Sequence, residues 1–156
     1  MHLIVHAGAG AIVGQATGNP WLAFLFGILS HIVLDVIPHG DSNLYKKYKN
    51  KELSTKKAMA GMALDSIASI VFVLLVFNLG IYNSKLVTSM AILGAIIPDV
   101  MIGLYELSYP KTPKIIKTIH KWHFKNHDLI ASKYDLSWKN GKIFQIIILF
   151  VILKML

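Results

Sequence analysis

Residues 58–79, AMAGMALDSIASIVFVLLVFNL, decide the fold class, because they contain a single charged residue, Asp65. A helix on the surface of a soluble domain needs a polar stripe, and this segment has almost none. Ser54 or Thr55 can cap the start of the helix. The segment therefore predicts a helix embedded in a membrane.

Apolar segments on both sides of it extend the pattern. We expect apolar helices over 3–17, 20–37, 86–108 and 142–156, and a polar, basic helix over 113–131. Breakers end several of them: Gly18-Asn19-Pro20, then Pro38, and Pro98-Asp99 inside the fourth apolar helix. The sequence thus predicts one all-α domain over residues 1–156, a small membrane-embedded bundle of five to six helices. The alternative is a soluble helical domain with very hydrophobic core helices.

The first helix is short and rich in glycine. At 1.5 Å per residue it reaches only about 22 Å, less than the roughly 30 Å hydrocarbon core of a bilayer. We expect it to be tilted inside the bundle or re-entrant. Gly10, Gly14 and Gly18 recur every four residues, a spacing that lets helices approach closely in lipid.

Composition narrows both location and partners. The chain is 54% hydrophobic and 15% charged, against about 25% charged residues in soluble domains, and its mean hydropathy is +0.55. The net charge is +8, and all 16 basic residues are lysine. Without arginine, the usual reader of guanine, nucleic acid is not an expected partner. Because the chain has no cysteine, disulfides and thiolate metal sites are excluded.

The lysines also predict an orientation. Most lie within the polar segments 38–57 and 109–142, whereas the turn at 80–85 offers only Lys85. The positive-inside rule places both polar segments in the cytoplasm, so we expect a protein of the cytoplasmic (inner) membrane. Membrane lipid and an anionic phosphorylated substrate are the expected partners, and a homo-oligomer is compatible with this interpretation.

This orientation brings the histidines and aspartates to one membrane face. His31 and Asp35 are four residues apart and share a helix face, so they could grip one metal ion or Asp35 could orient the His31 ring. His39 follows beyond Pro38, with Asp41 as a further candidate beside it. The rival interpretation is a polar helix end that meets the lipid head groups.

A second group lies in the basic helix. His120, His123 and His127 stand at i, i+3 and i+7, within about 60° of one another. Three imidazoles on one stripe suit Zn²⁺, Mn²⁺ or Fe, although a solvated basic helix would give the same pattern. Together with His31 and Asp35 they favour one or two divalent ions, with zinc first.

Carboxylates inside apolar helices indicate function, since an unpaired charge there costs several kcal/mol. Asp65 and Asp99 are both of this kind, and a structural hydrogen bond is the alternative. We expect Asp99 and His6 to be metal ligands. Asp65 or Glu106 would accept a proton from a metal-bound water.

Several of these motifs resemble those of a known family. His6-x-x-x-Gly10, Gly27-x-x-x-His31-x-x-x-Asp35, Gly94-x-x-x-Pro98-Asp99 and the histidine cluster 120–127 resemble the inner-membrane metal-dependent hydrolases of the YdjM type. They more distantly resemble the zinc-dependent phospholipase C group. The resemblance implies a helical metallohydrolase with histidine and aspartate ligands that acts on phosphoesters. The order of the Pro-Asp and His-x-x-x-Asp elements is reversed here.

The leading hypothesis is therefore a membrane-embedded metal-dependent hydrolase of phosphoester or phospholipid-type substrates. Its expected metal ligands are His6, His31, Asp35, His39, Asp99, His120, His123 and His127. A metal-ion or proton transporter is the first alternative, although the polar residues gather at one depth instead of continuing across the membrane. The second is a non-enzymatic membrane protein whose basic segments bind anionic lipid.

Overall fold

The computed structural model describes residues 1–41, 44–130 and 133–156, and this part of the chain folds into helices without any strand. The helices are α1 (Leu3–Ala16), α2 (Pro20–Val36), α3 (Leu44–Lys49), α4 (Thr55–Asn78), α5 (Lys85–Ser108), α6 (Lys114–His127) and α7 (Trp138–Met155). The all-α prediction is confirmed. The described part holds seven helices instead of five to six, because a short helix, α3, forms inside the polar segment that was expected to lack one.

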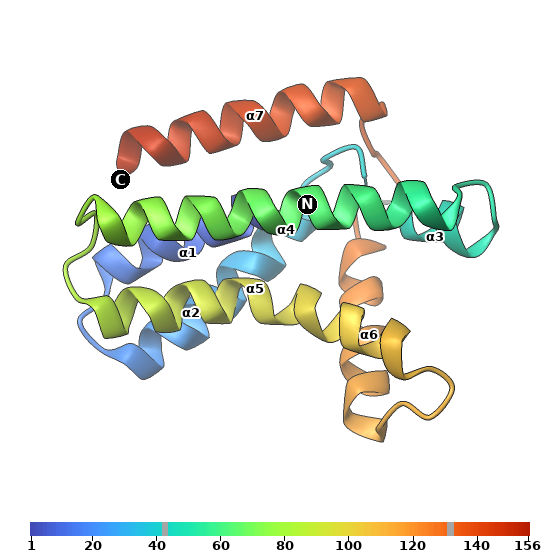
Figure 1. Cartoon of the computed structure of the whole chain (residues 1–156), viewed down its shortest axis with the longest axis horizontal. Coiled ribbons are helices and arrows are strands. Elements are labelled where there is room, and N and C mark those ends of the chain that lie inside the picture. The colour runs from blue at the N-terminus through green and yellow to red at the C-terminus, as the bar shows by residue number, and fades with distance from the viewer. Residues whose placement is uncertain (42–43, 131–132) are drawn as a thin grey trace.

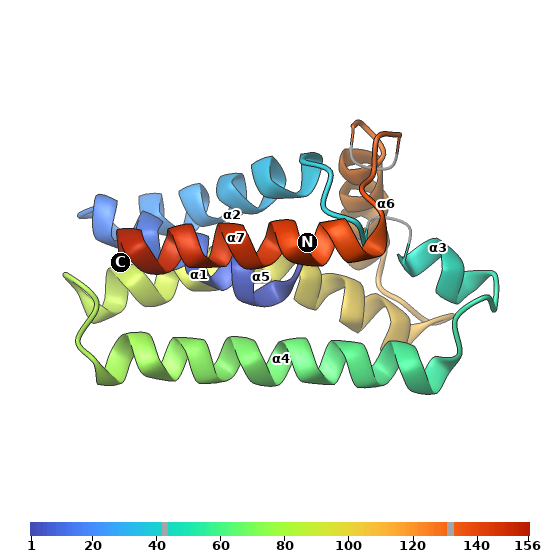
Figure 2. The same ribbon diagram turned by 90° about the horizontal axis from the view of Figure 1, so that it is seen from above.

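The long helices run side by side, and α6 lies across them (Figures 1 and 2). The short first helix, α1, occupies the interior and packs against α2, α4, α5 and α7. The most extensive contact joins α2 and α5. Both lysine-rich polar segments, which carry α3 and α6, lie toward one end of the bundle, while the α4–α5 turn lies at the other.

Helices α2 and α5 meet at two glycines. A Cβ atom on Gly27 would overlap the carbonyl oxygen of Ala91, and one on Gly94 would overlap the carbonyl oxygen of Phe24. Backbone therefore touches backbone at both positions, and no larger side chain fits there. This close approach sets the distance between the helices that carry His31 and Asp99.

The glycines of α1 serve the same purpose toward α5. A Cβ on Gly10 would lie 2.7 Å from the Cα of Ile92, and one on Gly14 would lie 2.6 Å from the Cα of Thr88. The predicted packing role is confirmed for these two residues. It is wrong for Gly18, which lies beyond the end of α1 and has no atom of the described residues within 4 Å of its Cβ position.

Three sequence-based boundaries require correction. Helix α5 continues through Pro98 without interruption, because a proline removes one hydrogen bond but the turns on either side can still hold the helix. The basic helix ends at His127 instead of 131, and α7 begins at Trp138 instead of 142. The Ser137 side chain accepts a hydrogen bond from the Asn140 amide and so caps the start of α7.

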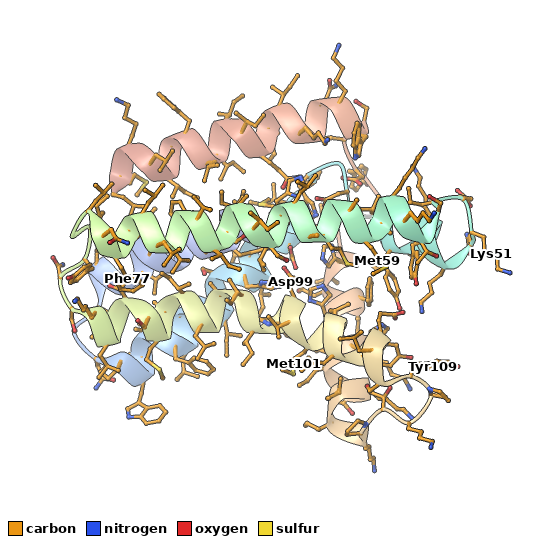
Figure 3. All side chains as sticks on the ribbon, viewed as in Figure 1. Lys51, Met59, Phe77, Asp99, Met101 and Tyr109 are labelled. Carbon is orange, nitrogen blue, oxygen red and sulfur yellow. The ribbon has the colours of Figure 1, made fainter. Side chains whose placement is uncertain are left out.

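Helices α4 and α5 are long and apolar enough to cross a membrane. Of the residues in the most apolar stretch of each, 17% are buried in α4 and 39% in α5. Large apolar side chains project outward from the helices, and Met59, which is 60% exposed, is a labelled example in Figure 3. The fold thus leaves much of its apolar surface outside the bundle.

Candidate metal centre

Helix α2 supplies the first pair of candidate ligands. His31 and Asp35 each have 1% of their surface exposed, and His31 Nε2 lies 2.9 Å from Asp35 Oδ2. The other ring nitrogen, Nδ1, lies 2.8 Å from the carbonyl oxygen of Ala95 on α5. Since a carbonyl only accepts hydrogen bonds, Nδ1 carries the proton and, in the neutral ring, Nε2 presents a lone pair. This is how a second partner orients a metal-ligating histidine.

Asp99 of α5 and His123 of α6 complete a group of four that could hold a metal ion. His31 Nε2 lies 3.8 Å from Asp99 Oδ1, and His123 Nε2 lies 3.8 Å from Asp99 Oδ1 and 3.9 Å from Asp35 Oδ2. Two ligands of a tetrahedral ion, each about 2.0–2.2 Å from it, are separated by about 3.3–3.6 Å. The four side chains are therefore spaced nearly as one ion requires. Burial lowers the pKa of His123 to about 4, so its ring is neutral near pH 7.

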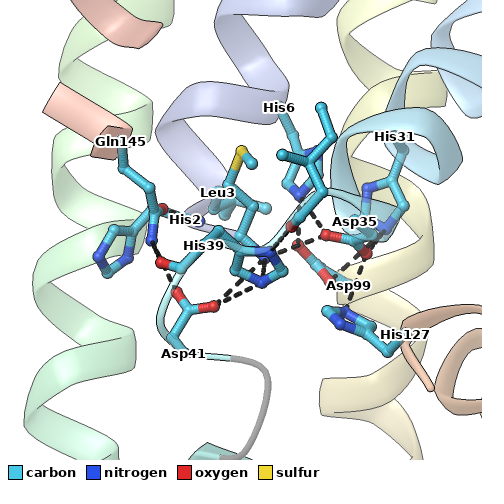
Figure 4. A network of polar contacts seen from close by, with 12 residues as sticks. His2, Leu3, His6, His31, Asp35, His39, Asp41, Asp99, His127 and Gln145 are labelled. Atoms are coloured by element: carbon cyan, nitrogen blue, oxygen red, sulfur yellow. Dashed lines mark hydrogen bonds and ion pairs between the residues drawn. The ribbon is translucent and has the colours of Figure 1, made fainter. Parts of the chain in front are cut away.

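A second group of three shares Asp35 with the first and adds His39 and His127. His127 Nε2 lies 3.0 Å from Asp35 Oδ2, and His39 Nδ1 donates to the Ile37 carbonyl, 2.5 Å away. Figure 4 shows these side chains converging on Asp35. The Met1 amine also lies here, 3.0 Å from Asp35 Oδ1 and 2.9 Å from His39 Nε2. One carboxylate thus connects both groups.

In the described part of the chain, several buried polar atoms at this centre have no hydrogen-bond partner apart from the close histidine–aspartate pairs. They include His31 Nε2 and Asp35 Oδ2, which face each other, and both ring nitrogens of His6. Buried polar atoms in native proteins nearly always have a partner. A lone pair beside a carboxylate oxygen is electrostatically unfavourable without a proton or a cation between them. The buried histidine and aspartate groups could therefore hold a metal ion.

His6 of α1 lies next to the first group but outside both. Its ring stacks on His31 with centroids 4.0 Å apart, and Nε2 lies 3.1 Å from Asp35 Oδ1 and 3.9 Å from Asp99 Oδ2. The residue is fully buried. The structure thus brings it to the cluster, in a position to orient Asp35 or to join the ligands.

Two predicted site residues lie together in a separate polar cluster. Glu106 accepts hydrogen bonds from Tyr45, 2.5 Å away, and from Lys49, 2.7 Å away, while His120 stacks on Tyr105. Neither Glu106 nor His120 belongs to a candidate metal group. Measured around α6 from Ile115, His123 lies at about 80° and His120 at about 140°. This further rotation of about 60° turns His120 toward α3. Burial and Glu106 raise the pKa of Tyr45, so the phenol keeps its proton.

Asp65 of α4 also lies outside both groups. Its carboxylate accepts hydrogen bonds from the backbone N–H groups of Leu3, at 2.7 Å, and Ile4, at 3.3 Å. His2 Nδ1 lies 3.3 Å from the same carboxylate. These N–H groups begin α1 and have no partner within that helix. The structure thus places Asp65 as a cap supplied by a neighbouring helix, which is the structural hydrogen bond considered as the alternative.

Gln145 is a site residue that the sequence reasoning missed. Its Nε2 donates to the His39 carbonyl, 2.8 Å away, and to Asp41 Oδ2, 3.2 Å away, while Oε1 accepts from the His2 amide at 2.7 Å. Asp41 in turn lies 2.7 Å from His39 Nε2. The signal was present in the sequence, since Gln145 is the single polar residue in the apolar run 143–153.

The fold and the site together define an all-α protein with a buried histidine–aspartate cluster and two helices long enough to span a membrane. Comparisons with protein-family models, with curated proteins and with solved structures found no match.

Proposed function

We propose that the protein is a membrane-embedded, metal-dependent hydrolase of phosphoesters, in line with the resemblance to the YdjM-type hydrolases. The observation that supports this most is the pair of ligand groups joined through Asp35. Its members come from α2, α5, α6 and the loop after α2. Burying histidines and aspartates from four segments together costs free energy, unless a bound ligand compensates for their charge and unmade hydrogen bonds.

The proposed membrane setting follows from the apolar surface. A soluble helical domain would bury its most apolar helices, whereas 17% of the apolar stretch of α4 is buried. Lipid would cover this surface in the native environment. With α4 and α5 across the membrane, the lysine-rich segments with α3 and α6 lie on the cytoplasmic side.

The donor set suits a hard or borderline divalent ion. Imidazole and carboxylate ligands favour Zn²⁺, Mn²⁺ or Fe²⁺, and zinc remains our first expectation. A divalent ion at the centre would lower the pKa of a bound water to about 7 and polarise a phosphoryl oxygen. The second group offers three protein ligands, which is the number that leaves a position open for water or substrate in catalytic sites.

The cavity next to the second group carries charges of both signs. It has a volume of about 350 Å³, and Gly40, Asp41, Asp135 and Lys47 are among its lining residues. Lys47 would pair with a phosphate there. Asp41 lies at the inner side, 2.7 Å from His39 Nε2, where it could accept a proton from a water molecule. Asp41 thus takes the role that we expected of Asp65 or Glu106 from the sequence.

The test uses two histidines three residues apart on α6. We expect elemental analysis of the purified protein to find stoichiometric metal in the wild type and in His120→Ala. Metal should be lost from the first group in His123→Ala, because of these two histidines His123 is the one that belongs to a ligand group. Equal metal content in all three proteins would refute the centre.

Activity is tested separately. We expect reconstituted wild-type protein to release phosphate or a phosphorylated head group from lipid or soluble phosphoesters, and His127→Ala, which lacks a ligand of the second group, to release none. Stoichiometric metal without hydrolysis, together with metal flux into liposomes, would favour the transporter instead. Metal-free protein that is folded in lipid would favour the non-enzymatic alternative.

A further inference from the structure

The outer surface of α6 carries exposed apolar side chains that take no part in the metal centre. Ile115 and Trp122 are seven residues apart and lie within about 20° of each other around the helix. Their exposed fractions are 66% and 46%, and Leu129, just beyond the helix end, is 55% exposed. These residues form a partly exposed apolar stripe. Asn126 interrupts it, since it lies about 20° from Ile115 and donates a hydrogen bond to the Ile32 carbonyl on α2, 3.2 Å away.

The apolar stripe separates two other faces of α6. His123 and His127 lie about 80–120° from Ile115 in one direction, and both are buried toward Asp35. Lys121 and Lys125 lie about 80–120° away in the other direction. The helix thus has a histidine face toward the bundle, a basic face, and an apolar face between them.

The basic face opens into water. A groove of about 470 Å³ lies between α3 and α6, and Lys46, Lys121 and Lys125 are among its lining residues. The polar side of α6 therefore points toward α3. The apolar stripe points away from this groove, which is the direction in which lipid would lie beside α5.

The orientation of α6 fits the same picture. Figures 1 and 2 show α6 crossing the direction of α4 and α5. If α4 and α5 span a bilayer, a helix across them lies parallel to its surface. A helix rich in lysine on one face, with tryptophan and aliphatic side chains on another, is typical of one that lies in the interface.

We infer that α6 lies in the plane of the lipid–water interface, with Ile115, Trp122 and Leu129 among the upper acyl chains. Its lysines, above all Lys114, Lys121 and Lys125, contact the phosphates of anionic phospholipids. Charge complementarity favours lipid over a protein partner here, since the apolar stripe is narrow and bordered by lysines. The inference rests on the membrane insertion in the proposed function but not on the hydrolytic activity.

A consequence for the metal centre follows from this placement. His123 and His127 are on the same helix as the stripe, so the centre lies at the depth of the lipid head groups. Anchoring α6 in the interface would hold both histidines against Asp35.

The three tryptophans of the chain allow a direct test in the full-length protein. One variant keeps only Trp122 (Trp21→Phe and Trp138→Phe), and a second keeps only Trp21, which is 71% exposed at the start of α2. A third moves the probe to the basic face, with Lys121→Trp and Trp122→Phe in the first background. All three are reconstituted in phosphatidylcholine vesicles with 30% phosphatidylglycerol, and quenching by brominated lipid and by aqueous acrylamide is measured.

We expect brominated lipid to quench Trp122 strongly and acrylamide to quench it several-fold less than the Lys121→Trp probe. Accessibility of Trp122 to acrylamide equal to that of the Lys121→Trp probe would overturn the inference. So would protection from acrylamide without quenching by lipid, because this would mean that protein covers the stripe. If lipid quenches neither Trp122 nor Trp21, the membrane insertion itself fails, whereas quenching of Trp21 alone refutes only the docking of α6.

The charge contribution has a matched control. Replacing Lys114, Lys121 and Lys125 by glutamine should weaken lipid quenching of Trp122 in the anionic vesicles. In phosphatidylcholine alone this triple variant should match the parent. Replacing Lys51, Lys56 and Lys57 instead should leave the quenching unchanged. Equal behaviour of the two triple variants in the anionic vesicles would remove anionic lipid as the partner.

Discussion

Adding one methyl group at Gly94 should disturb both the stability of the bundle and the metal centre. A Cβ at this position would lie 3.0 Å from the carbonyl carbon of Phe24 and 3.2 Å from its Cα, with the carbonyl oxygen nearer still. Carbon atoms in contact are separated by about 3.5 Å or more. In Gly94→Ala, α2 and α5 must therefore move apart by about 0.5 Å or more.

Gly103 on the same helix provides the control. Among residues 1–41, 44–130 and 133–156, no atom lies within 4 Å of its Cβ position, so Gly103→Ala should gain about 1 kcal/mol of helix stability without a clash. Gly94→Ala gains the same term but also pays about 1–3 kcal/mol for overpacking. At about 2–4 °C per kcal/mol for a chain of this size, Gly94→Ala should unfold roughly 2–12 °C below Gly103→Ala.

The displacement also reaches the candidate ligands. Ala95, whose carbonyl accepts the proton of His31 Nδ1, directly follows Gly94, and Asp99 lies one turn further along α5. Disturbing an outer partner of a ligating histidine typically weakens metal binding by about 10–100-fold. Thermal unfolding in detergent and metal titration of both variants test this. Equal midpoints and equal metal affinities in the two variants would refute the argument from backbone contact.

Three further predictions follow. Gln145→Ala should lower the free energy of unfolding by about 1–3 kcal/mol, because the His39 carbonyl and the groups around it lose a buried partner. Chemical denaturation of this variant beside the exposed control Asn140→Ala tests this, and equal stability of the two variants would contradict it. Asp65→Ala should lower the free energy of unfolding by about 1–2 kcal/mol through loss of the α1 cap, but the variant should still bind metal. Ser66→Ala is the control, and loss of metal from folded Asp65→Ala would mean that Asp65 belongs to the metal site. Removing metal with a chelator should lower the midpoint of thermal unfolding, since an ion at 100 times its dissociation constant stabilises the folded protein by about 2.7 kcal/mol. If the chelator leaves the midpoint of metal-loaded protein unchanged, this prediction is wrong.

Local sequence determined where the helices lie, and it did so through side-chain chemistry near each position. Long apolar runs, Pro20 at the first turn of α2 and the caps at Ser54 and Ser84 mark most of the helix bounds. The short α3 was missed because a lysine-rich segment has no apolar periodicity to reveal a helix. Pro98 was overestimated as a breaker, since α1 and α2 pack against the turns of α5 that precede it.

The sequence predicted the candidate site in part, because local spacing and composition reveal some of its residues but not their neighbours in space. His31 and Asp35 share a helix face by spacing alone, and intramembrane carboxylates stand out in apolar runs. Nothing local distinguishes His120 from His123, which are three residues apart, because the difference depends on which neighbour each ring meets. Asp65 and Asp99 look equally unusual in sequence, yet one caps α1 and the other faces His31.

Composition and short-range periodicity are enough to establish the all-α class, the apolar helices and the residue types able to bind a metal. Which of those residues meet depends on how the helices pack. The contact of α2 with α5 through Gly27 and Gly94, and the crossing of α6 over the bundle, place His31, Asp99 and His123 around Asp35. Such convergence depends on the packing of distant segments, and no short stretch of the chain encodes it.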